Sequence, residues 1–264
     1  GGDQLVRSLA VWIDHKPLIV FTMHHTRHLG WEGFAFWELI FPLFVFLSGV
    51  SMSFSLRLRL ERGESKKNLY FRLLRRALLL IFLGMSLGLF RMDWVNLRPL
   101  SVLGLIGMAN LIAGVVVINR GVLGQLSWAF GLLIGYHLVC VAVPVPDTQA
   151  GPFTPGGHLG GYLDRHILPG KLFQDVYDPE GTLSFFPAAA MVLLGASAGS
   201  LLRSVKFDGR QRVLILVCFG VLSLLSGYAW SCWFPIIKSM WSSSYIMVTA
   251  GWSLLLVAFF YLLI

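Results

Sequence analysis

Residues 122–143 read VLGQLSWAFGLLIGYHLVCVAV, a stretch of 22 residues without a single Asp, Glu, Lys or Arg. A helix of about 20 apolar residues crosses the hydrocarbon core of a bilayer, which is about 30 Å thick. Further runs of this kind occur on both sides of it. The predicted spans are Phe34–Leu56, Leu73–Phe90, Leu100–Ile118, Val122–Val143, Leu183–Leu202, Val213–Phe234 and Ser243–Ile264. The sequence therefore predicts an all-α, polytopic membrane bundle of about seven transmembrane helices, in one domain over residues 1–264.

The composition of the chain favours the same class. Of the 264 residues, 56% are hydrophobic and only 13% are charged, and the mean hydropathy is +0.73. Soluble domains carry about 25% charged residues, and a soluble core of this size could not bury so much apolar surface. Disordered chains have the opposite composition. A soluble enzyme and a disordered chain are therefore both disfavoured.

The net charge of +8 has a simple explanation in a membrane protein. Basic residues concentrate in cytoplasmic loops, so we expect no nucleic-acid partner. The cysteines Cys140, Cys218 and Cys232 all lie in apolar runs and form no CxxC pair, so neither a disulfide nor a metal site is predicted. The sequence also lacks a Walker loop, a GxGxxG fingerprint and an HExxH zinc motif.

The distribution of basic residues predicts the orientation. Thirteen Lys and Arg residues flank or follow the first, third and fifth spans, against five in the other loops. We expect the first group on the cytoplasmic side. The segment before the first span and the Pro- and Gly-rich connection 144–182 then lie on the extracytoplasmic side, and residues 159–168 could form a short interfacial helix. We also expect a fragment truncated at both ends, because the chain starts without Met and stops inside an apolar run.

Two ionisable residues near the first span are candidates for chemistry. His28 stands just outside the span, and an imidazole near neutral pH can act as base, nucleophile or acyl carrier. Glu38 lies about one turn inside, where a carboxylate is costly and commonly functional. Pro42 cannot donate to the carbonyl of Glu38, so that carbonyl is freed and a kink is expected. The alternatives are an interfacial histidine without a role and a capping or snorkelling carboxylate.

Other polar residues are expected on the same side of the membrane as His28. Asp178 and Glu180 precede the fifth span, where an Asp before Pro179 also suits a helix start. Two cations and two tryptophans are candidate substrate-binding residues: Arg98, Lys238, Trp31 and Trp241. Arg98 and Lys238 could instead be interface anchors, and Trp31 could be only an interfacial aromatic.

A basic cluster is expected on the cytoplasmic side. Arg72, Arg75 and Arg76 belong to a run of cations between Arg57 and Arg76 that could hold phosphate groups. The alternative, which we favour from these residues alone, is that the cluster only sets the orientation of the chain.

Taken together, four segments resemble the heparan-alpha-glucosaminide N-acetyltransferase family of membrane acyltransferases, especially its bacterial homologues. These segments are His28–Gly33 with Glu38–Phe46, Leu60–Ser65 with Arg75–Leu80, Asn96–Arg98 with Ser101–Gly104, and Asp178–Ser184 with Pro187 and the Gly195 region. Lys238, Trp241 and Trp252 fit as well. Two positions depart from the family: Glu38 stands where Asp is usual, and Leu105 stands where homologues commonly have Arg.

The resemblance implies a transferase of the bacterial cytoplasmic (inner) membrane. It would move an acetyl group from cytosolic acetyl-CoA to an amino sugar or glycan of the glucosamine type on the extracytoplasmic side, without a metal. His28 occupies the position of the family's active histidine, and Glu38, Asp178 or Glu180 could orient it. Arg72, Arg75 and Arg76 would steer the phosphates of CoA, and a homodimer is compatible with the family.

Two other functions stay open at this point. The same polar residues could bind a sugar or a lipid-linked intermediate in a transporter, although no inverted repeat is visible in the sequence. The chain could also be a catalytically inactive membrane homologue, and Leu105 is the residue that favours this hypothesis.

Overall fold

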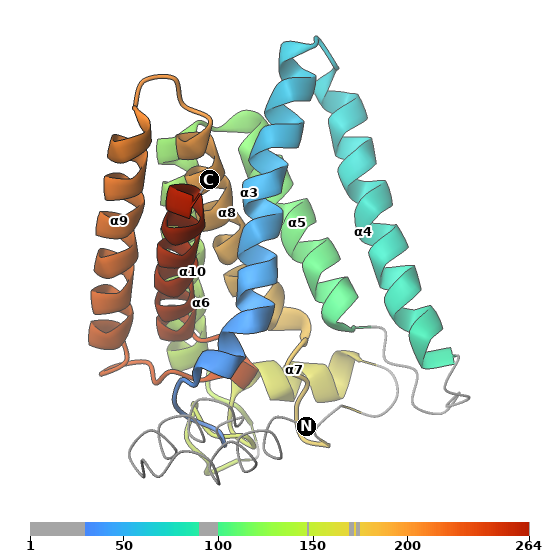
Figure 1. The fold of residues 1–264 in the computed structure, drawn as a ribbon. Helices are drawn as coiled ribbons and strands as arrows, with labels where there is room; N and C mark the ends of the chain where they lie inside the picture. Colours follow the sequence, from blue (N-terminus) through green and yellow to red (C-terminus); the bar gives the residue numbers. More distant parts are fainter. Residues whose placement is uncertain (1–29, 90–99, 147, 169–171, 173–174, 264) are drawn as a thin grey trace, which may run out of the picture.

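The structure is a computed structural model that describes residues 30–89, 100–146, 148–168, 172 and 175–263 (Figure 1). All regular elements in this part of the chain are helical. In order they are η1 (Phe36–Leu39), α3 (Ile40–Glu61), α4 (Lys66–Leu89), α5 (Val102–Asn119), α6 (Val122–Ala142), α7 (Leu159–Ile167), η3 (Thr182–Ser184), α8 (Phe185–Leu202), α9 (Gly209–Trp230), η4 (Lys238–Met240) and α10 (Ser243–Leu263).

The prediction of an all-α membrane bundle is confirmed. Each predicted span corresponds to one long helix, with ends that differ by up to seven residues. Six of the described helices are long and apolar enough to cross a membrane, and α4 is not among them. The reason is its first half, which carries five charged residues: Lys66, Lys67, Arg72, Arg75 and Arg76. The short helix predicted at residues 159–168 is also present, as α7.

Helix α8 occupies the centre of the bundle. It contacts α3, α5 and α6 extensively and also touches α9 and α10. Its sequence explains this position, because several faces of the helix present little more than backbone. The small residues are Ala188, Ala189, Ala190 and those of the segment 195–199. Small residues let neighbouring helices approach closely, and such packing drives helix association in lipid.

Helices α3 and α8 are in close contact. A Cβ atom added to Gly49 would overlap the carbonyl oxygen of Val192, and one added to Gly195 would overlap the carbonyl oxygen of Phe46. Further along, a Cβ on Gly199 would stand 2.7 Å from the carbonyl oxygen of Val50. The two helices therefore approach closely at Gly195 and Gly199, where a side chain would overlap the neighbouring backbone.

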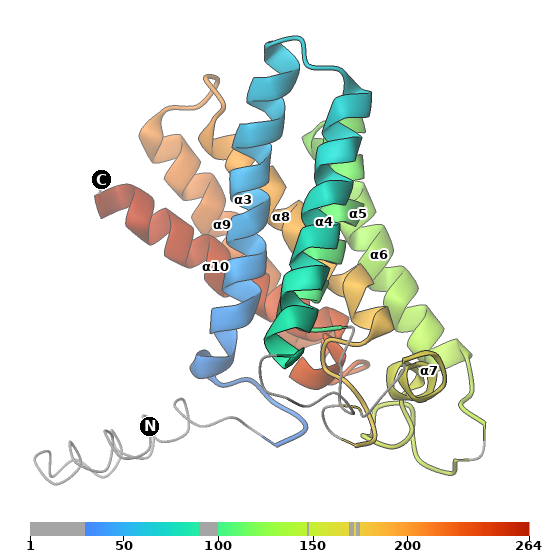
Figure 2. The ribbon, with the colours of Figure 1, turned by 90° about the vertical axis from the view of Figure 1, so that its right-hand side faces the viewer.

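The connections divide between two ends of the bundle. The α3–α4, α5–α6 and α8–α9 connections lie at one end, here called the basic end, and they are the connections with the excess of Lys and Arg (Figure 1). The opposite end, here called the polar end, holds η1, α7 and η4 (Figure 1). Figure 2 shows α10 strongly inclined to α3, while α4 lies on the outside against α5. The grouping of loops expected from the charges is thus reproduced.

The close contact at Gly195 predicts that the same substitution, glycine to alanine, has different effects on stability at two positions. Gly195→Ala should lower the thermal stability of the detergent-solubilised protein, because overpacking against backbone costs about 1–3 kcal/mol. Gly131→Ala, on an exposed part of α6 with nothing within 4 Å of its added Cβ, should leave stability unchanged or slightly raised. Size-exclusion chromatography after heating measures both variants. Equal stability of the two variants would refute the close α3–α8 contact.

Candidate polar site

Three chain segments that are distant in sequence meet at the polar end. They are residues 30–39, the connection 148–184 and the segment 231–242. The backbone N–H of Gly33 donates a hydrogen bond of 2.8 Å to the carbonyl of Ile236, which ties the first segment to the third. The hydroxyl of Tyr177 lies 3.5 Å from that of Ser239 and links the second segment to the third.

Glu38 lies where the geometry of the chain changes. Residues 36–39 form the 3₁₀ turn η1, and the α-helix starts at Ile40. The freed carbonyl predicted at Glu38 accepts a hydrogen bond of 2.9 Å from the hydroxyl of Tyr245 on α10. The carboxylate itself is buried, and its Oε2 atom accepts from the backbone N–H of Ala35 at 3.4 Å. Pro42 therefore leaves a free acceptor that a side chain of the last helix satisfies.

Lys238 provides a positive charge for this buried carboxylate. Its Nζ atom lies 3.8 Å from Oε1 of Glu38, and its side chain is one-third exposed while that of Glu38 is only 4% exposed. A carboxylate in such a position requires charge compensation. Trp241, three residues on, is buried and packs its ring edge-on against Phe41. The candidates Glu38 and Lys238 are therefore brought together, while Trp241 forms part of the core beside them.

Trp31 is held by the long connection. Its indole N–H donates to the carbonyl of Phe153 at 2.5 Å. Its ring lies 5.0 Å from that of Tyr177 in an edge-on contact, and 5.6 Å from the ring of His158. The rings of His158 and Tyr177 also contact each other at 5.5 Å. Three aromatic rings thus form one cluster at the polar end.

Asp178 and Glu180 lie next to this cluster. Asp178 is buried, and its Oδ1 atom accepts from the backbone N–H of Glu180 at 3.0 Å. Asp164 on α7 is also buried, and its Oδ1 atom accepts from both the backbone N–H and the hydroxyl of Thr182, each at 2.9 Å. Burial raises the pKa of Asp164, and the nearby charge of Asp178 adds to this effect. The carboxylate of Asp164 therefore ties α7 to the turn that precedes α8, while that of Asp178 closes a local turn.

His158 is a buried histidine that caps α7. Its Nδ1 atom accepts a hydrogen bond of 2.9 Å from the backbone N–H of Gly161, so the proton of the neutral ring is on Nε2. The Nε2 atom is buried and has no hydrogen-bond partner among the described residues. Burial, and then the charge of Arg165, lower the pKa of His158 to about 4. The ring is therefore neutral at physiological pH.

Two predicted residues, His28 and Arg98, lie outside the described residues. The three arginines predicted to bind CoA, by contrast, are described. They lie in the half of α4 nearer the basic end, at the far side of the bundle from Glu38 (Figure 1). The Nε atom of Arg72 forms a 2.7 Å ion pair with Glu64, while Arg75 and Arg76 are exposed. Their role in phosphate binding stays a prediction.

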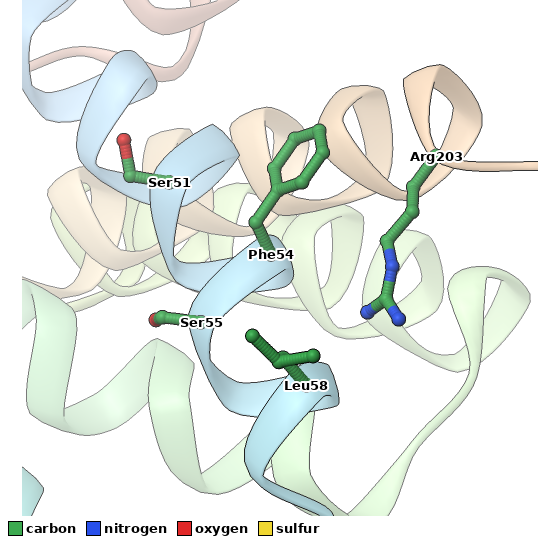
Figure 3. A pocket seen from close by; sticks show the side chains of 5 residues that line it. All are labelled: Ser51, Phe54, Ser55, Leu58 and Arg203. Carbon is green, nitrogen blue, oxygen red and sulfur yellow. The ribbon is translucent and has the colours of Figure 1, made fainter. Parts of the chain in front are cut away.

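The basic end also has an open groove of about 510 Å³ between α3 and α8. Figure 3 shows its lining residues, which are Ser51, Phe54, Ser55, Leu58 and Arg203. The guanidinium of Arg203 comes from the end of α8 and pairs with the carboxylate of Glu61 at the end of α3. The groove therefore combines an apolar wall with a cation that is already paired.

The position of residues 195–199 in the fold excludes a serine-hydrolase motif there. Residues 195–199 read Gly-Ala-Ser-Ala-Gly, which matches the Gly-x-Ser-x-Gly pattern of serine hydrolases. That motif requires a sharp turn between a strand and a helix. Here all five residues lie inside α8, and the side chain of Ser197 is buried. The segment is a helix-packing surface, and it has no nucleophile elbow.

No group of three or more His, Cys, Asp or Glu side chains suited to a metal ion occurs within the described ranges.

Three residues of the polar end are not among the site residues predicted from the sequence: His158, Asp164 and Tyr245. His158 has a visible signal, since it is flanked by two pairs of glycines at 156–157 and 160–161. Asp164 and Tyr245 have none, because their importance depends on contacts with Thr182 and Glu38 that are distant in the sequence.

The fold and this end of the bundle define a multi-pass membrane protein with a buried, charge-compensated polar site. The chain is distantly related to heparan-alpha-glucosaminide N-acetyltransferase. It is 27% identical to the human protein over 299 aligned positions and 29% identical to the mouse protein over 297. Each alignment covers 90% of this chain and 44% of the relative, so the chain spans less than half the length of these relatives. No protein-family model matches the sequence.

The ion pair at the polar end predicts a measurable coupling. Lys238→Met should lower the thermal stability of the purified protein, because the buried carboxylate of Glu38 loses this cation. Glu38→Gln combined with Lys238→Met should cost less than the sum of the two single changes, with a coupling of about 1–3 kcal/mol. Strictly additive effects would show that the two charges do not interact.

Burial of His158 predicts a pH dependence with a defined sign. The unfolded ring binds a proton near pH 6.5, whereas the folded ring resists until about pH 4. Its contribution to stability is therefore complete above pH 6.5 and is lost as the pH falls towards 4, by about 3 kcal/mol. Melting curves at pH 7 and pH 4.5 should show a larger loss in the unmodified protein than in His158→Phe. An equal loss would contradict the assignment.

Proposed function

We propose that this protein is a membrane acetyltransferase that transfers the acetyl group of acetyl-CoA to the amine of a glucosamine-type sugar. The observation that carries the proposal is the similarity to the human N-acetyltransferase along 90% of the chain. The polar end supports it, because a buried carboxylate, an ammonium group and an aromatic cluster lie together there. Such a combination suits a polar substrate at the edge of a membrane.

The positive-inside rule supports an orientation of the two ends of the bundle in the membrane. The basic end faces the cytoplasm, where acetyl-CoA is available, and the polar end faces the opposite compartment with the sugar. Arg75 and Arg76 are exposed near the basic end and attract the phosphates of CoA. The membrane in question is the cytoplasmic membrane of a bacterium.

His28 carries the proton or the acetyl group in this proposal. In the direct route the sugar amine attacks the thioester carbonyl, the imidazole takes the amine proton, and the C–S bond breaks to release CoA as a thiol. In the two-step route an imidazole nitrogen attacks first, CoA leaves, and the amine then takes the acetyl group and restores the imidazole. The Glu38–Lys238 pair supplies fixed charges around this chemistry.

Leu105 favours the alternative of an inactive homologue. Its side chain is fully buried in the apolar core. An arginine at this position, as expected for homologues, would place a cation inside the bundle. If this position is essential for binding acetyl-CoA, membranes containing the unmodified protein bind none, and Leu105→Arg restores binding.

A radiolabelled acetyl-CoA assay on membranes tests the proposal, with N-acetylglucosamine as the measured product. His28→Ala should reduce the rate at least about 100-fold, because general acid–base help is worth about 10²–10⁴-fold. His166→Ala is the matched control, since His166 is exposed on α7 and should leave the rate within about twofold. Full activity of His28→Ala would remove this histidine from the mechanism. Sugar uptake into vesicles without consumption of acetyl-CoA would favour a transporter.

A further inference from the structure

The open groove at the basic end runs along the last turns of α3. Ser51, Ser55 and Leu58 are three or four residues apart, so they share one face of the helix. Phe54 stands beside them, and Phe54 and Leu58 are 42% and 43% exposed. Figure 3 shows the side chain of Arg203 extending from the end of α8 towards Leu58. Since α3 is long and apolar enough to cross a membrane, this exposed apolar wall meets lipid.

The dimensions of the groove fit an acyl chain. Leu58 follows Ser51 by seven positions, which corresponds to about 10 Å along an α-helix. One leaflet of the hydrocarbon core is about 15 Å thick, so the groove covers most of the depth of one leaflet. Helices α3 and α8 end at Glu61 and Leu202, and Arg203 therefore lies where the charged groups of a membrane helix reach the surface.

Arg203 has a hydrogen-bonding capacity that the described protein does not use. Its Nη2 atom donates to the carboxylate of Glu61, whereas its Nη1 atom is buried and has no hydrogen-bond partner among the described residues. A guanidinium carries five N–H donors in a planar fork that matches the oxygens of a phosphate group. A charged donor without an acceptor is unfavourable. The side chain is still 28% exposed, so an anion at the groove can reach it.

We propose that the groove binds an anionic phospholipid, with an acyl chain along Phe54 and Leu58 and the phosphate at the guanidinium of Arg203. Charge complementarity supports an anion, because the connections at this end carry the excess of Lys and Arg, and such segments attract anionic lipids. The apolar wall supports a lipid over a free phosphate, which would leave Phe54 and Leu58 uncovered. This binding does not depend on the proposed acetyl transfer.

Two features bear on the choice of ligand. Coenzyme A also carries phosphates, but the amides of its arm would lie against an apolar wall that faces hydrocarbon, where unpaired polar groups are costly. The carboxylate of Glu61 opposes any anion at Arg203, since it competes for the same guanidinium. Removing this carboxylate should therefore strengthen lipid binding, which gives the proposal a test with the opposite sign to the loss of Arg203.

Native mass spectrometry of the detergent-solubilised protein measures lipid binding directly. Phosphatidylglycerol and phosphatidylcholine with identical acyl chains are titrated in turn, so that the two lipids differ in the charge of the headgroup. We expect the unmodified protein to prefer phosphatidylglycerol about fivefold, as for one cation near an anionic lipid. Arg203→Gln should abolish this preference, and Glu61→Gln should increase it.

Two pairs of variants separate the groove from the general charge and apolar surface of the protein. Arg210→Gln removes the same charge from the exposed start of α9, and should keep the preference within about twofold of its original value. Ser51→Phe fills the groove without touching the Arg203–Glu61 pair, and should weaken the binding of phosphatidylglycerol at least about fivefold. Ser127→Phe makes the same change on an exposed face of α6 and should have no effect.

The proposal is supported if Arg203→Gln and Ser51→Phe lose phosphatidylglycerol while both control variants retain it. An undiminished preference in Arg203→Gln overturns it, and so does unchanged binding in Ser51→Phe. Displacement of the lipid by millimolar inorganic phosphate or acetyl-CoA would assign the groove to a soluble phosphate ligand and would also overturn it. If Arg203→Gln does not fold, Glu61→Gln and Ser51→Phe decide, because neither removes the cation.

Discussion

The direct contact of the α3 and α8 backbones is the constraint on which the rest of the structure depends. At Gly49 and Gly195 no side chain separates the two helices, so their backbones are in direct contact at these points. Helix α8 also contacts α5, α6 and α10, and a change in this separation would be transmitted to all of them. Because η1 continues directly into α3, Glu38 is attached to the helix that makes this contact.

The membrane-spanning architecture was readily predicted from sequence because its physical cause is local. Long apolar runs such as 122–143 have few options in a bilayer other than to form helices, since every buried backbone group needs a partner. The division of loops between two ends followed from the same spans and the positions of the basic residues. Helix α4 was harder, because it begins at Lys66, in a basic stretch that precedes the apolar run from which the span Leu73–Phe90 was predicted.

The candidate site was only partly predictable. Glu38 was identified because a carboxylate within an apolar helix is costly, and the freed carbonyl because Pro42 cannot donate to it. The partner of each could not be deduced: Lys238 and Tyr245 lie about 200 residues further along, and no local pattern indicates such a contact. His158 was likewise visible only as a residue of a Gly-rich connection, and its burial arises from packing against Trp31 and Tyr177.

The hydrogen bond from Tyr245 to the carbonyl of Glu38 has a consequence for biosynthesis. The two residues are separated by 207 positions, so about 10–40 s of translation pass between them at about 5–20 residues per second. During that time the acceptor freed by Pro42 lacks its final donor. The 3₁₀ turn at Glu38 is therefore completed by the helix that emerges last of those described. Within the described bundle, the polar end therefore gains this hydrogen bond only after α10 has been made, long after the segment that carries Glu38.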